Sequence, residues 1–152
     1  MTPQPVRIRF MDSSGAVAGH WFLRPDPEHP EGWKLSFWFR DDPEELRHNR
    51  RCTKGTGYTA AMEYLWDRIL LRAKQRYIKY KEARADVVED LADRAPRPGF
   101  RPSYHKALRS RLENAWRVWR SHYTSSVRDH IKFLNTQGWP VVTAPPWPWE
   151  SP

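Results

Sequence analysis

Apolar and polar residues alternate one by one in the first 40 residues of the chain. The clearest run is Val6-Arg7-Ile8-Arg9-Phe10, and residues 16–23 and 33–40 show further apolar stretches. A period of two is typical of β-strands with one buried face. The turn sequence Asp12-Ser13-Ser14-Gly15 and the proline-rich residues 24–32 separate these stretches. The pattern therefore predicts a three-stranded antiparallel meander over residues 1–40.

The spacing of apolar residues then lengthens to three or four. Two windows, 58–95 and 103–137, contain neither proline nor glycine and are rich in Ala, Leu, Arg, Lys and Glu. Such composition is typical of helices. Residues 96–102 hold three prolines and a glycine, and Gly138 with Pro140 follows the second window. We expect two long helices that pack as an antiparallel hairpin around a turn at 96–102.

These elements give a predicted fold class of α+β, in the order β-β-β-α-α. With 152 residues the chain suits a single domain over 1–152. Residues 41–57 are expected to form a basic loop before the first helix, and residues 138–152 a Pro/Trp-rich C-terminal tail. Nine tryptophans in this length are far more than a disordered chain carries.

Composition narrows the class of protein further. The only cysteine is Cys52, so an internal disulfide is excluded and a reducing compartment is favoured. We find no signal-peptide pattern at the N-terminus and no apolar run of membrane-spanning length. The expected location is the cytoplasm, without a membrane partner.

Period two divides the predicted sheet into two faces. The apolar face, expected to be buried under the first helix, comprises Val6, Ile8, Phe10, Val17, Trp21, Leu23, Trp33, Leu35, Phe37 and Phe39. The opposite face comprises Arg7, Arg9, His20, Phe22, Lys34, Ser36, Trp38 and Arg40, without an acid among them. Bases interleaved with aromatics suit phosphate neutralisation and base stacking. The alternative is a solvated face whose arginine stems cover the aromatic rings.

Positive charge is concentrated around the second helix. Residues 94–132 hold ten Lys and Arg against Glu113 and Asp129, a net charge of +8, which equals the net charge of the whole chain. At 100° per residue, five of these bases share one arc of the helix: Lys106, Arg109, Arg117, Arg120 and Arg128. Acids four residues away are nearly absent, so we expect this arc not to be neutralised by its own helix. Such a surface attracts polyanions.

The loop before the first helix also carries bases. Arg50, Arg51 and Lys54 lie close to Gly55 and Gly57, and could hold a phosphate at the helix N-terminus. The order of residues is not that of a P-loop, and a flexible basic loop explains it as well. Catalysis by Cys52 with His48 has the least support, because four residues of spacing in a loop positions no base.

The first helix has apolar residues on two sides. One stripe steps by three or four residues, through Met62, Trp66, Ile69, Ala73, Tyr77, Tyr80, Val87 and Leu91. A second stripe on the opposite side comprises Tyr64, Leu71 and Ile78. Either the sheet and the second helix bury one stripe each, or the second stripe contacts another copy of the chain or a partner.

Two functions compete on this evidence. The first is a non-enzymatic nucleic-acid-binding protein, with DNA favoured over RNA because β-sheet readers enter DNA grooves. The second is a small interaction protein or inhibitor, of the kind encoded by phages and mobile elements, that binds an acidic or nucleic-acid-handling partner. No cofactor or metal site is predicted, and a homodimer is possible. The predicted contact residues are Arg7, Arg9, Lys34, Trp38, Arg40, Arg50, Arg51, Lys54, Lys106, Arg109, Arg117, Arg120 and Arg128.

Overall fold

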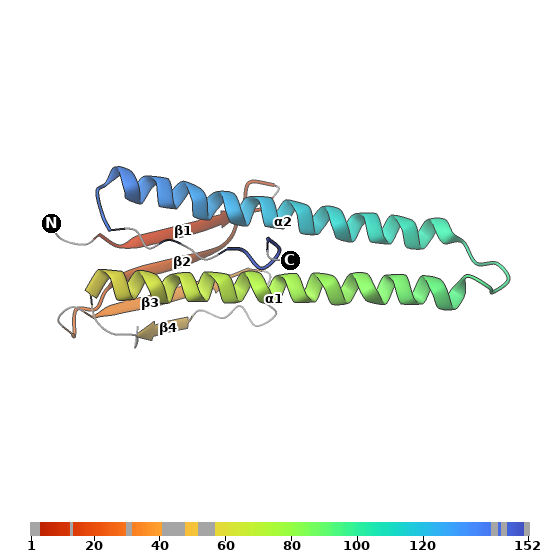
Figure 1. Cartoon of the computed structure of the whole chain (residues 1–152), viewed down its shortest axis with the longest axis horizontal. Helices are drawn as coiled ribbons and strands as arrows, with labels where there is room; N and C mark the ends of the chain where they lie inside the picture. Colours follow the sequence, from red (N-terminus) through yellow and green to blue (C-terminus); the bar gives the residue numbers. More distant parts are fainter. Residues whose placement is uncertain are drawn as a thin grey trace. The chain divides into compact units, whose positions relative to one another are not determined.

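A computed structural model of the chain describes residues 4–12, 14–29, 32–40, 48–51, 57–140, 143 and 146–150. Its elements follow in the order β1 (Val6–Met11), β2 (Val17–Pro25), β3 (Trp33–Phe39), β4 (His48–Arg51), α1 (Gly57–Arg94) and α2 (Pro102–Thr136) (Figure 1). The α+β class and the hairpin of two helices are confirmed. Both helices begin and end within one residue of the predicted bounds. After α2, Gly138 takes a positive φ of 75°, the backbone conformation that commonly ends a helix.

The sheet has one strand more than the sequence predicts. All neighbours are antiparallel, in the order β1-β2-β3-β4 (Figure 1). The prediction of a loop over the whole of 41–57 is wrong at His48–Arg51, which pairs with residues 34–37 of β3. Pairing satisfies backbone groups along an edge of β3 that would otherwise lack partners. The strand is entirely polar, so no apolar alternation reveals it.

The chain divides into two compact units that share both helices. We call Met1–Ile69 with Ser121–Pro145 the strand unit, and Leu70–Arg120 with Pro146–Pro152 the hairpin unit. The prediction of a single domain over 1–152 stays a prediction. No helix in the described part of the chain is long and apolar enough to cross a membrane.

The core of the strand unit lies between the sheet and the parts of the helices that belong to this unit, residues 57–69 of α1 and 121–136 of α2. On the sheet, Val6, Ile8, Leu23 and Leu35 are at most 1% exposed, as the alternation predicts. The prediction that Val17 is buried is wrong, because this residue is 37% exposed. The register between β1 and β2 shifts between Phe10 and Met11, which takes Val17 out of the regular alternation. The helices bury Met62, Leu65, Trp66, Ile69, Tyr123, Val127 and Leu134 in the same unit.

Tyr123 of α2 joins three elements of the strand unit. Its ring stacks on Phe10 of β1 with centroids 4.4 Å apart and an angle of 5°. Its hydroxyl donates a 2.9 Å hydrogen bond to the carbonyl oxygen of Ile69 in α1. A buried hydroxyl needs such a hydrogen-bond partner. Through these two contacts Tyr123 holds α2 against both β1 and α1.

The hairpin unit is held together by aromatic rings. Tyr80 of α1 and Trp116 of α2 stack with centroids 4.9 Å apart and an angle of 6°. Trp149, beyond the helices, meets Trp116 edge-on at 5.5 Å and stacks on Trp147 at 5.2 Å. Trp147 is 8% exposed. These two tryptophans thus pack on the hairpin, while residues 141–142, 144–145 and 151–152 of the predicted tail lie outside the described residues.

Candidate nucleic-acid interface

The polar face of the sheet presents cross-strand rows of bases and aromatics. In the sheet register Arg7 lies beside Phe22, and Arg9 lies beside His20, which in turn neighbours Trp38. Arg24 lies beside Lys34. We call Arg7, Arg9, His20, Phe22, Arg24, Lys34 and Trp38 the strand face. Its arginines are exposed, and its aromatic rings are half-buried.

Two arginines of the strand face lie over an aromatic ring. The guanidinium carbon of Arg7 is 4.7 Å from the centroid of Phe22, and that of Arg24 is 5.9 Å from it. His20 and Trp38 form a second pair, with centroids 6.0 Å apart. The guanidinium groups of these two arginines therefore lie over Phe22, an arrangement related to the alternative that the sequence left open, in which arginine side chains cover the aromatic rings. Charged ends remain exposed above the ring.

Acids reach this part of the sheet from the turns. Arg40 donates to the carboxylate of Asp12, and Lys34 Nζ lies 3.8 Å from Asp26 Oδ1. Although no acid lies on this face of the sheet itself, Arg40 and Lys34 therefore each meet an acid from a turn. Turn residues follow no period of two, so the strand pattern does not reveal them. Hydrogen bonds from Ser14 and Arg40 hold the pKa of Asp12 well below its usual range.

Of the predicted basic loop over residues 41–57, the structure describes the backbone of residues 48–51 and 57. Arg50 and Arg51 lie in β4, at register positions beside Leu35 and Lys34. The side chains of these two residues, and the whole of Lys54 and Cys52, lie outside the described residues. The phosphate-binding hypothesis for this loop stays a prediction.

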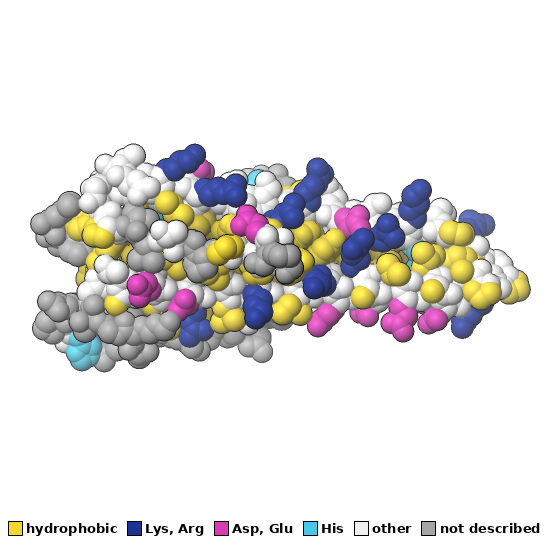
Figure 2. All heavy atoms as spheres, viewed as in Figure 1, with side chains coloured by type: hydrophobic (Ala, Val, Ile, Leu, Met, Phe, Trp, Pro, Cys, Tyr) yellow, Lys and Arg dark blue, Asp and Glu magenta, His cyan; other side chains and the backbone are white. Residues whose placement is uncertain are grey.

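The bases predicted to share an arc lie on one helix, α2, as expected. In the hairpin unit Lys106, Arg109 and Arg117 are exposed and Arg120 is half-buried. We call these four residues the α2 arc. Arg128, the fifth predicted base, is exposed in the strand unit. Figure 2 shows the dark blue Lys and Arg side chains that gather over α2 and over the seam between the helices of the hairpin unit.

The α2 arc contains an ion pair with an acid of its own helix. Glu113 lies four residues after Arg109, and its Oε1 is 3.6 Å from Arg109 Nε. The same oxygen accepts a 3.1 Å hydrogen bond from Arg84 Nε of α1. Arg117 donates to the neutral side chain of Asn114 at 2.7 Å. One carboxylate thus serves two exposed arginines and leaves net positive charge.

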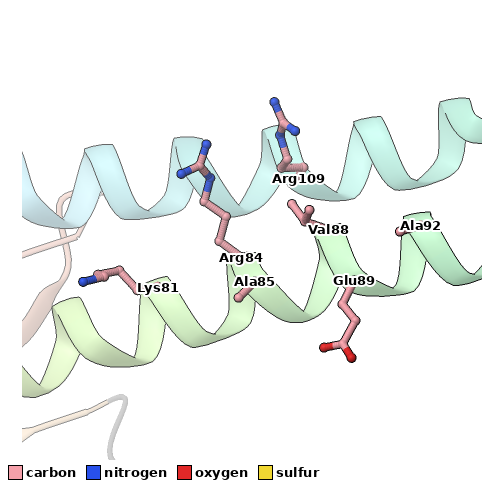
Figure 3. A pocket seen from close by; sticks show the side chains of 7 residues that line it. All are labelled: Lys81, Arg84, Ala85, Val88, Glu89, Ala92 and Arg109. Carbon is pink, nitrogen blue, oxygen red and sulfur yellow. The ribbon is translucent and has the colours of Figure 1, made fainter.

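The structure adds two bases from α1 that the sequence did not single out. Lys81 and Arg84 line an open groove with Arg109, and Ala85, Val88 and Ala92 supply its apolar surface (Figure 3). Arg84 reaches from α1 toward α2, whereas Glu89 points away from α2. The Nζ of Lys81 lies 5.1 Å from the ring centroid of Tyr77. Only the register of the hairpin brings these residues next to the α2 arc.

The ion pairs of Arg84 and Arg109 with Glu113 are open to solvent. The side chains of Arg84 and Arg109 are 50% and 47% exposed, and that of Glu113 is 40% exposed. Ion pairs this open to solvent contribute between about 0 and 1 kcal/mol, so an arriving phosphate can displace the carboxylate at little cost. Within the described ranges, no three His, Cys, Asp or Glu side chains cluster closely enough to hold a metal ion.

Comparison with known proteins gives no relative. The chain matches no protein-family model, no curated protein and no solved structure.

Proposed function

We propose that the protein binds nucleic acid without catalysing a reaction on it, and that the α2 arc is the main contact. One observation carries the proposal. Residues 70–120 hold 14 Lys and Arg against six Asp and Glu, so this stretch has a net charge of +8, and the bases of the arc are largely exposed. Positive charge concentrated on the two helices and the turn of the hairpin releases counterions from a polyanion on binding, which is the dominant source of nonspecific affinity for DNA.

The geometry of the arc favours duplex DNA. Fourteen residues separate Lys106 from Arg120, a distance of about 21 Å at ~1.5 Å per residue. The major groove of B-DNA is about 12 Å wide and admits an α-helix, whereas the major groove of A-form RNA is too deep and narrow for one. Bases on one side of a straight helix can then follow the phosphates that border the groove.

The strand face offers a second mode of contact. Arg9 has no acidic partner among the described residues, and Trp38 lies beside it across His20. Arginine and aromatic rings on a sheet suit unpaired bases, because stacking on a ring is tolerant of sequence. This second contact predicts measurable binding to single strands as well as to duplex.

The test compares two variants with the same loss of charge. K106Q/R109Q/R117Q removes three bases of the arc. R97Q/R111Q/K132Q removes three exposed bases from other parts of the turn and of α2. We expect the first variant to bind a fluorescent duplex about 100-fold more weakly than wild type at ~0.1 M salt. The control should lose less than about threefold, because it removes long-range attraction but no direct contact. Equal losses in both variants would show that only net charge matters and would refute a site on the arc.

A second candidate, a protein-interaction module, is favoured by exposed apolar residues on α1. Leu71 and Ile78 are 42% and 44% exposed. A partner held by apolar anchors loses little affinity between about 50 and 200 mM salt, whereas phosphate contacts weaken steeply over that range. Binding that survives high salt would therefore support this candidate over the first.

A further inference from the structure

An apolar stripe on α1 has no partner within the described residues of the hairpin unit. Leu71, Ile78, Ala85 and Ala92 recur every seven residues and are all exposed. At 100° per residue they lie on the side of α1 away from Tyr80, whose ring stacks on Trp116 of α2, and Ala85 and Ala92 also border the groove beside Arg109. We call these four residues the outer stripe. A seven-residue apolar repeat is typical of a seam between two helices.

Charges along the outer stripe are sorted by sign. Its first half is flanked by Lys74 and Lys79, and residues 70–81 contain no acid. Its second half is flanked by four exposed acids, Glu82, Asp86, Glu89 and Asp93. In Figure 2 the magenta acids line the edge of α1 that faces away from α2.

These charges are not neutralised by their own helix. Glu82 and Asp86 are four residues apart, as are Glu89 and Asp93, and like charges at this spacing repel each other. None of the six flanking charges makes an ion pair with another described residue. Acids near the C-terminal end of a helix also oppose its dipole. A cationic surface from outside the hairpin would relieve both effects.

We propose that the outer stripe binds a second copy of this chain, with the two α1 helices antiparallel. A two-fold axis beside Lys81 and Glu82 places Ile78 opposite the partner's Ala85, and Leu71 opposite the partner's Ala92. The same register sets Lys74 against the partner's Glu89. It sets Lys79 between the partner's Glu82 and the partner's Asp86. Each basic half thus meets an acidic half, twice per dimer.

The charges set the orientation, while the small apolar area sets the strength. A parallel pair would place lysine against lysine and acid against acid, so it is disfavoured. Two of the four stripe residues are alanine, which buries little surface. An interface below about 1,200 Å² is typical of transient association, and we expect a dissociation constant of about 10–100 µM at low salt.

Charge exchange tests the proposal in solution. In K74E/K79E the whole stripe is flanked by acids, and in E82K/E89K the lysines replace two acids. Analytical ultracentrifugation should show each variant alone dimerising at least about tenfold more weakly than wild type. Mixing the two should restore association as a heterodimer. R97E/R111E, which alters two exposed charges outside the stripe, should dimerise like wild type, and far-UV circular dichroism checks that every variant is folded.

Three results would overturn the proposal. A wild-type chain that stays monomeric up to about 500 µM at low salt has no such interface. Two variants that fail to associate when mixed would show that the lysines and acids do not meet. If R97E/R111E dimerises as weakly as the two stripe variants, dimerisation depends on net charge and not on the charges beside the stripe.

Discussion

The Nε2 atom of His105, near the start of α2, lies 2.6 Å from Oδ2 of Asp90, near the end of α1. The His105 side chain is only 6% exposed, and Phe100 and Tyr104 lie against its ring. The other carboxylate oxygen of Asp90 accepts a 2.8 Å hydrogen bond from Arg94. The contact ties the two helices together beside the turn that joins them. Asp90 thus has two basic partners, His105 and Arg94.

The stability of the hairpin unit should fall at low pH because the carboxyl group of Asp90 becomes protonated. The hydrogen bond from His105, and then that from Arg94, hold the pKa of Asp90 below its usual value. A carboxyl group with a lowered folded-state pKa stabilises the fold above its unfolded pKa of about 3.9, and this contribution is lost as the pH falls through the folded-state pKa. Asp90→Asn should therefore melt below wild type at pH 7, and the two melting curves should converge near pH 2. A constant difference at all pH values would contradict this role.

His130 should affect the stability of the protein at a higher pH than Asp90 does. Burial lowers the pKa of His130, and its Nε2 atom is buried with no hydrogen-bond partner among the described residues. The folded state therefore favours neutral imidazole, and stability present above an unfolded pKa of about 6.5 is lost as the pH falls.

His130→Met keeps an apolar side chain of similar size and cannot be protonated. It should be about 1 kcal/mol more stable than wild type at pH 5 in urea unfolding, with a smaller difference at pH 8. A variant less stable than wild type at pH 5 would show that the imidazole makes a stabilising contact instead.

Trp149 should matter more to the hairpin unit than its position near the end of the chain suggests. Its indole contacts Tyr77, Trp116, Trp119 and Trp147. Trp149→Ala should destabilise the protein by about 2 kcal/mol in urea unfolding, roughly half the cost for a fully buried tryptophan. Tyr104→Ala is the matched control, since Tyr104 is 68% exposed, and should cost less than about 0.5 kcal/mol. Similar losses would mean that Trp149 does not anchor this segment.

The sequence predicts the helices best because they are marked by chemistry that acts locally. Gly57 and Pro102 are the first residues of α1 and α2, and Gly138 lies two residues after the end of α2. Proline or glycine at these positions has a direct backbone effect. The strands β1 to β3 follow from period two. The polar strand β4 does not, because it is defined by hydrogen bonds to β3 and not by its own side chains.

The candidate site could be predicted only in part, and for a similar reason. Positions on one helix follow from 100° per residue, which is how the sequence groups the bases of the α2 arc. Pairing between Arg84 and Glu113 depends on how the two helices align across the turn. The partners of Arg40 and Lys34 depend on how two turns fold back onto the sheet. Neither follows from a periodic pattern.

The most direct test of the proposed function is the salt dependence of duplex DNA binding. The slope of log Kobs against log salt concentration is about −0.9 per phosphate neutralised, measured between ~50 and 200 mM NaCl. Four bases in the arc predict a wild-type slope of about −3.6 or steeper, and K106Q/R109Q/R117Q should reduce its magnitude by about 2.7. A wild-type slope near zero, or one that the triple substitution leaves unchanged, would contradict nucleic-acid binding through α2.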